Sequence, residues 1–130
     1  MKKTCRVLFI LLSILFFTQG PSFADGTSTD AIVEIATIMH RLKHYPSPAG
    51  KETLQKLAQN ASTTANEKTI ITAMLNLQHH VGAADKASLS TLVQDSKATH
   101  EERSIATILL NLDHRPTSQD KTILSGIIGK

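Results

Sequence analysis

Apolar positions follow two periods along the chain, one of a helical turn and one of 35 residues. Ile70, Met74 and Leu77 stand four and three residues apart, which places them on one face of a helix. The same pattern returns after 35 residues, and aligned pairs include Leu54 and Leu89, Leu57 and Leu92, Thr64 and Thr99, Glu67 and Glu102, Leu75 and Leu110, and His79 and His114. The chain is therefore an array of one repeated helical unit.

Recurring caps divide each unit into two helices. Residues 64–67 and 99–102 both carry Thr followed three residues later by Glu, the spacing of a capping box. Pro48 suits the first position of another helix. The sequence predicts no strand, and it predicts six helices over residues 30–44, 48–59, 65–79, 83–94, 100–114 and 118–128.

Short connections place successive helices antiparallel, and identical helix pairs stack side by side. We therefore expect an all-α fold, a short α-solenoid of antiparallel helix pairs. A closed bundle of six helices is the alternative.

The first 24 residues have the pattern of a secretory signal peptide. Three basic residues precede an apolar run over residues 7–17, and small residues stand before an expected cleavage point after Ala24. The run is shorter than the roughly 20 residues of a membrane span, so an uncleaved anchor is the weaker alternative. We expect a periplasmic or secreted protein with a flexible leader over 25–29 and a repeat domain over 30–130.

Removal of the signal changes the charge and the chemistry of the chain. Three of the 14 basic residues lie in the signal, which leaves 11 basic against 11 acidic residues and a net charge of zero. Tyr45 is then the only aromatic residue, and no cysteine is left. We therefore expect no nucleic-acid partner, no cofactor and no disulfide.

One unit resembles a known repeat family. Asp95, followed by Arg103, Ala106 and Leu110, is similar to the pattern of HEAT-type repeats, and the 35-residue period is similar to that of tetratricopeptide repeats. The resemblance implies a helical-hairpin array that binds proteins and is not an enzyme.

Three histidines recur with the period, His44, His79 and His114, each at the end of an equivalent predicted helix. Packed helices lie about 8–10 Å apart, whereas the nitrogens that share one Zn²⁺ each lie about 2 Å from it. We therefore expect a row of histidines that does not chelate. An imidazole near a helix C-terminus can instead bond the last carbonyl groups.

His40 and His44 stand four residues apart, so they share one face of the first predicted helix and could bind a metal ion together. Weak periplasmic metal binding by this pair is the alternative function. A polar outer helix that caps the array explains the same residues without a metal.

The polar face of the longer helices carries an aligned stripe, composed of Thr37, Arg41, Thr72, Asn76, Thr107 and Asn111. In stacked arrays such a face takes up partner segments, although a solvated face is the simpler interpretation. No nucleophile elbow, phosphate loop or metalloprotease pattern is present. We expect an exported, non-enzymatic module that binds a protein or peptide through this stripe.

The last predicted helix is the most apolar of its kind and is not followed by a longer helix. An open array should be polar on its outer face. We therefore expect a homodimer through Ile123 and Ile127. The alternative is a monomer in which Ile123 folds inward.

Overall fold

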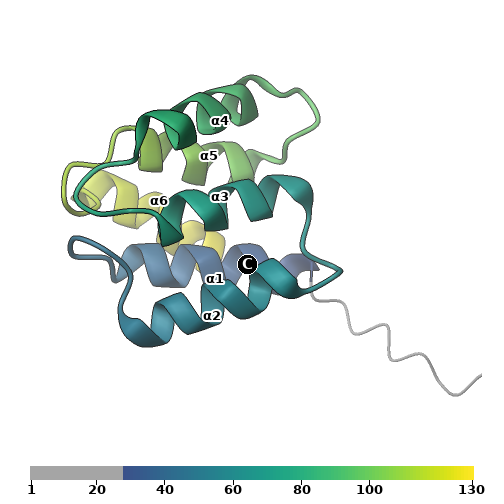
Figure 1. Cartoon of the computed structure of the whole chain (residues 1–130), viewed down its shortest axis with the longest axis horizontal. Helices are drawn as coiled ribbons and strands as arrows, with labels where there is room; N and C mark the ends of the chain where they lie inside the picture. The colour runs from purple at the N-terminus through teal and green to yellow at the C-terminus, as the bar shows by residue number, and fades with distance from the viewer. Residues whose placement is uncertain (1–27) are drawn as a thin grey trace, which may run out of the picture.

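The computed structural model describes residues 28–130, and helices run through this whole range (Figure 1). They are α1 (Ser28–His40), α2 (Pro48–Gln59), α3 (Ala65–Leu75), α4 (Ala83–Gln94), α5 (His100–Leu110) and α6 (Ser118–Ile128). The prediction of an all-α fold is confirmed. The predicted signal peptide lies outside the described residues. Within them, no helix is both long and apolar enough to cross a membrane.

The helices α2 to α6 begin at the predicted residues, whereas α1 begins at Ser28, two residues before its predicted start. The Thr64 hydroxyl accepts a hydrogen bond from the Glu67 amide, and the Glu67 carboxylate accepts one from the Thr64 amide. Thr99 and Glu102 form the same capping box at the start of α5. The predicted bounds of α2, α4 and α6 are confirmed as well. Local capping chemistry thus sets the helix starts.

The three helices that were predicted to be longer, α1, α3 and α5, end four residues before the predicted positions. In each, a leucine just beyond the helix donates its amide to the carbonyl three residues back, which closes a tighter final turn. These leucines, Leu42, Leu77 and Leu112, are buried. These leucines also fit the helical apolar pattern. The sequence pattern is therefore the same for a longer helix and for a shorter helix that is followed by a buried leucine.

The array closes into a ring, because α6 packs against α1. The helices α1, α3 and α5 contact one another and occupy the middle of the molecule, whereas α2, α4 and α6 each bridge two of them on the outside (Figure 1). Two repeat units are α2 with α3 and α4 with α5, and the third is assembled from α6 and α1. The arrangement is the closed six-helix alternative with approximate threefold symmetry, and not an open solenoid.

Ring closure removes the open end on which the predicted dimer was based. Ile127 is only 5% exposed and belongs to the buried core, together with Leu124 of the same helix. Ile123 is 38% exposed. Because α1 takes the place of the helix that α6 was expected to lack, Ile127 is not available as an interface residue. A homodimer itself stays a prediction.

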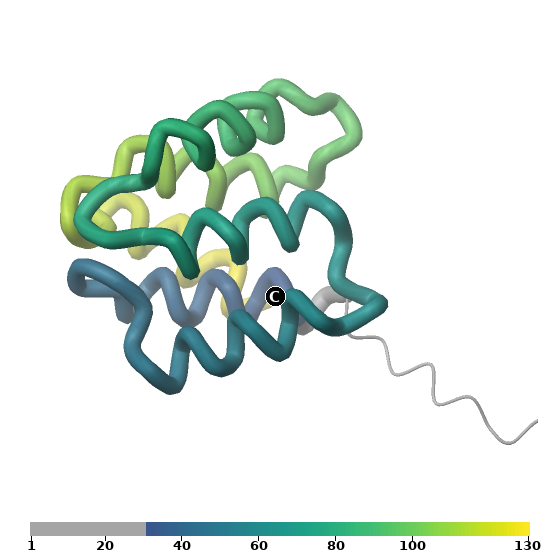
Figure 2. The backbone as a smooth tube through the Cα atoms, in the orientation of Figure 1, coloured from purple at the N-terminus to yellow at the C-terminus, as the bar shows by residue number. Residues whose placement is uncertain are grey.

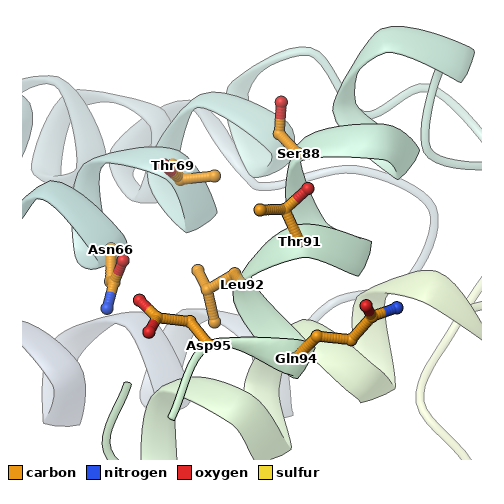
Figure 3. A pocket seen from close by; sticks show the side chains of 7 residues that line it. All are labelled: Asn66, Thr69, Ser88, Thr91, Leu92, Gln94 and Asp95. Carbon is orange, nitrogen blue, oxygen red and sulfur yellow. The ribbon is translucent and has the colours of Figure 1, made fainter. Parts of the chain in front are cut away.

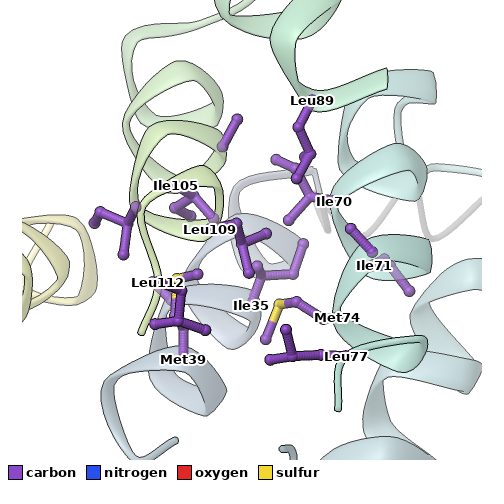
Figure 4. Packing of buried hydrophobic residues seen from close by; sticks show 14 of the residues in the cluster. Ile35, Met39, Ile70, Ile71, Met74, Leu77, Leu89, Ile105, Leu109 and Leu112 are labelled. Carbon is purple, nitrogen blue, oxygen red and sulfur yellow. The ribbon is translucent and has the colours of Figure 1, made fainter. Parts of the chain in front are cut away.

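The core consists of side chains in sets of three equivalent positions. The side chains of these sets that Figure 4 labels point toward one another between α1, α3 and α5. One set is Ile35, Ile70 and Ile105, a second is Met39, Met74 and Leu109, and a third is Leu42, Leu77 and Leu112. Each set is 35 residues apart in sequence, so the repeat period brings like residues to a common axis.

Two buried glutamates lie where α3 and α5 begin, and one of them, Glu102, joins the two helices. Glu67 and Glu102 are 3% and 5% exposed. The Thr64 hydroxyl and the Asn66 amide both donate to the Glu102 carboxylate, at 3.0 and 3.1 Å. Burial raises the pKa of Glu67 above its ordinary value, against the opposing effect of its hydrogen bonds to Thr64. Because Thr64 caps α3 and also bonds Glu102 of α5, this helix cap is also a tertiary contact.

Candidate metal centre

Three loops of the same design lie at one end of the molecule. They connect α1 to α2, α3 to α4 and α5 to α6, and they stand on the left in Figure 2. Each loop runs from a buried leucine through an exposed histidine to a buried proline or valine, and then to the cap of the next helix. The three segments are residues 42–47, 77–82 and 112–117. Buried residues on both sides therefore fix the position of each histidine.

The three loop histidines converge at this end. Ring centroids lie 5.5 Å apart for His44 and His79, 5.4 Å for His44 and His114, and 5.2 Å for His79 and His114. One nitrogen from each ring can be chosen so that all three lie within 4.8 Å of one another. All three side chains are exposed. We call this cluster the histidine triad.

The ring spacing of the histidine triad matches that of ligands on one metal ion. With a metal–nitrogen bond of about 2.0–2.1 Å, ring centroids of two ligands on a tetrahedral ion lie about 5 Å apart. The observed spacings of 5.2 to 5.5 Å are close to this value. Because the rings are already at this spacing, ring rotation is the main change needed to point three nitrogens at one ion.

The spacing from which we predicted that this row does not chelate is wrong, since the rings lie 5.2 to 5.5 Å apart. The prediction placed the histidines on the helices and used the distance between helix axes. Instead, α1 ends at His40, α3 at Leu75 and α5 at Leu110, so the histidines lie in loops beyond the helix ends. In a closed ring with threefold symmetry, equivalent positions face a common axis, and the imidazoles reach across the gap between the backbones.

Asp113 orients His114. Nδ1 of His114 lies 2.6 Å from Oδ1 of Asp113. A carboxylate only accepts hydrogen bonds, so Nδ1 carries the proton and Nε2 is left to bind a metal. His114 also adopts φ of 63°, in the left-handed region that histidine enters more readily than most residues. The Arg115 amide donates to the Asp113 carbonyl at 2.7 Å across this turn.

The predicted pair of His40 and His44 does not share a helical face. The helix α1 ends at His40, so His44 lies in the following loop. His40 is half-buried at a position equivalent to Leu75 and Leu110. The structure thus brings His44 to His79 and His114. The four-residue spacing between His40 and His44 does not place these two rings on one helical face.

The predicted polar stripe is divided among separate grooves. Thr37 and Arg41 line a groove between α1 and α2, whereas Thr107 and Asn111 line one between α5 and α6. Asn76 donates to Asp85 of α4, so it faces the α3–α4 side. In addition, the hydroxyls of Thr37, Thr72 and Thr107 each donate to the carbonyl four residues earlier, at 2.8 Å. The closed ring therefore does not join these residues into one surface.

A pocket of about 630 Å³ lies between α3 and α4 (Figure 3). Its hydroxyl groups belong to Thr69, Ser88 and Thr91, and each donates to a carbonyl of its own helix. The amide of Asn66, which also lines the pocket, donates to Glu102. These donors are engaged within the protein, so the pocket presents no convergent set of groups toward a ligand.

Comparison with known proteins gives no match, since no family model fits the chain and neither a curated protein nor a solved structure is similar to it. The similarity to HEAT-type repeats stays a prediction.

Arg103 donates to the backbone carbonyls of Asp95 and Ala98, at 3.3 and 2.8 Å. It thus holds the α4–α5 loop against α5.

Proposed function

We propose that this protein is an exported metal-binding protein that holds one Zn²⁺ ion on His44, His79 and His114. The convergence of these three imidazoles from three loops is the observation that carries the proposal. Imidazole nitrogen is a common ligand of Zn²⁺, and three such ligands with an open fourth position form a recurrent zinc geometry. Cu²⁺ and Ni²⁺ also accept imidazole, but they favour square-planar or tetragonal arrangements.

The surface position of the histidine triad favours binding over catalysis. All three side chains are exposed, so a bound ion lies at the surface, within reach of other molecules. Catalytic sites, in contrast, are usually concave and exclude water. The proposed role is therefore to take up, hold or deliver a metal ion outside the cytoplasm.

A binding module for a protein or peptide is the second candidate. The grooves lined by Thr37 and Arg41, and by Thr107 and Asn111, support it, because each offers polar side chains beside an apolar one. The metal proposal has the stronger support, since the histidine triad is one convergent set of ligands and the grooves are separate.

Calorimetric titration of the purified protein with Zn²⁺ tests the proposal. We expect one ion per chain and a rise in thermal stability, because the ion links three loops of the folded state alone. At free Zn²⁺ of 100 times Kd, the free energy of unfolding should rise by about 2.7 kcal/mol. A melting temperature that does not respond to Zn²⁺ or to a chelator would contradict the proposal.

A further inference from the structure

His80 is a fourth imidazole at the edge of the histidine triad. It follows His79 directly in the α3–α4 loop, and its side chain is exposed. Its ring centroid lies 5.5 Å from that of His114, with the ring planes at 78°. This distance to His114 falls within the range of spacings inside the triad, whereas the ligand atoms that already lie within 4.8 Å of one another are those of the triad. No equivalent histidine exists in the other two loops, where Tyr45 and Arg115 stand at this position.

The side of the histidine triad that faces the core offers no ligand. Two residues before each histidine, the chain passes through a buried leucine of the core cluster, at Leu42, Leu77 and Leu112. Aliphatic side chains have no lone pair to donate to a metal ion. A fourth ligand must therefore come from the outer side, which faces solvent.

Among the residues at the outer side, His80 is the best available ligand. The guanidinium of Arg115 keeps its positive charge and has no free lone pair. The ring of Tyr45 contacts Lys51, whose Nζ lies 5.5 Å from the ring centroid, and a phenol oxygen is a less common metal ligand than an imidazole nitrogen. The carboxylate of Asp113 is bonded through Oδ1 to His114, as the partner that orients a ligand.

We propose that His80 is the fourth ligand of the metal ion, which makes the site a tetrahedral set of four histidines. The inference rests on the proposed metal-binding function. The exposed side chain can turn toward the ion by rotation about its own bonds, because no hydrogen bond in the described chain ties its ring to a partner and its closest ring contact is a triad member. A tetrahedral set of four nitrogens suits Zn²⁺ and Co²⁺, and it disfavours the square-planar arrangement of Cu²⁺. His80 would thus set the metal preference of the site.

Competition with a chromophoric chelator, applied to the full protein, tests this assignment. We expect His80→Ala to weaken Zn²⁺ affinity about tenfold or more, since even the outer partners of metal ligands contribute 10- to 100-fold. The absorption spectrum of the Co²⁺-loaded protein gives a second readout, because tetrahedral Co²⁺ absorbs visible light far more strongly than Co²⁺ with five or six ligands. We expect His80→Ala to reduce this absorption.

His100→Ala is the matched control. His100 is exposed in the first turn of α5, about 15 Å of helix away from the loop that carries His114. The His100→Ala variant should bind Zn²⁺ and Co²⁺ as the unchanged protein does. If the unchanged protein binds Zn²⁺ and His80→Ala matches it in both affinity and Co²⁺ spectrum, the fourth-ligand assignment is overturned and the metal-binding function stands. If the unchanged protein binds no Zn²⁺, both proposals fail.

Discussion

His79 and His114 are 35 residues apart in sequence, yet their ring centroids lie 5.2 Å apart. The contact depends on closure of the helical array into a ring, in which α1, α3 and α5 pack around one axis. Each repeat delivers one imidazole to the end of that axis. The sequence repeat thereby brings one histidine from each of three loops together, as the histidine triad of the proposed metal site.

Asp113→Asn should weaken Zn²⁺ binding about 10- to 100-fold, because the carboxylate fixes the tautomer and orientation of His114. Calorimetric titration measures this change. Asp85→Asn is the control, since that carboxylate accepts a hydrogen bond from Asn76 and contacts no histidine ring. Equal affinities for the two variants would show that Asp113 does not position a ligand.

The helix starts could be predicted from the sequence because capping is local. Thr64 and Thr99 satisfy backbone groups within three residues, so the chemistry is visible in four letters. The helix ends could not be predicted in the same way, since Leu77 continues the apolar pattern whether or not the helix does. Because the predicted helices were four residues too long, the prediction placed His44, His79 and His114 on helices, whereas they lie in loops.

Ring closure was the second feature that local patterns did not reveal. The packing of α1 against α6 joins the two ends of the described chain, and no pairing of neighbouring units indicates it. The useful signal was the triple recurrence of histidine at one position of a repeat. In an open array these residues form a row, whereas in a closed ring of three they share an axis.

Thr64→Ala should destabilise the protein more than Thr99→Ala. Loss of a threonine cap costs about 0.5 to 2 kcal/mol at either site. Thr64 in addition donates its hydroxyl to the buried Glu102 carboxylate of another helix, at 3.0 Å. Denaturant unfolding of the two variants compares them directly. A larger loss for Thr99→Ala would contradict a tertiary role for the Thr64 cap.

Leu109→Ala should cost about 2 to 5 kcal/mol of unfolding free energy, as truncations in a closed core do. Leu110→Ala should cost less, because Leu110 is only partly buried whereas Leu109 is fully buried. Thermal or urea unfolding of this adjacent pair measures the difference. The reverse order would mean that α5 presents a different face to the axis.

Glu67→Gln should gain stability relative to the unchanged protein as pH rises from about 4.5 to neutrality. Burial raises the pKa of Glu67, so the folded state binds its proton more tightly than the unfolded state. The unchanged protein therefore loses stability as pH climbs from the unfolded pKa through the folded one. The side-chain oxygen of glutamine can accept the same hydrogen bond from the Thr64 amide, and glutamine does not ionise. Urea unfolding across this pH range should show the divergence, and parallel curves would contradict it.

Zinc calorimetry on single alanine variants of His44, His79 and His114 tests the central claim most directly, with His40→Ala as the control. Each triad variant should lose most of the Zn²⁺ affinity, because in the proposed site the three imidazoles bind the same ion. His40→Ala should bind as the unchanged protein does. If His79→Ala and His114→Ala bind normally while His40→Ala and His44→Ala do not, the ion sits on the pair in the first repeat and the shared axial site is wrong.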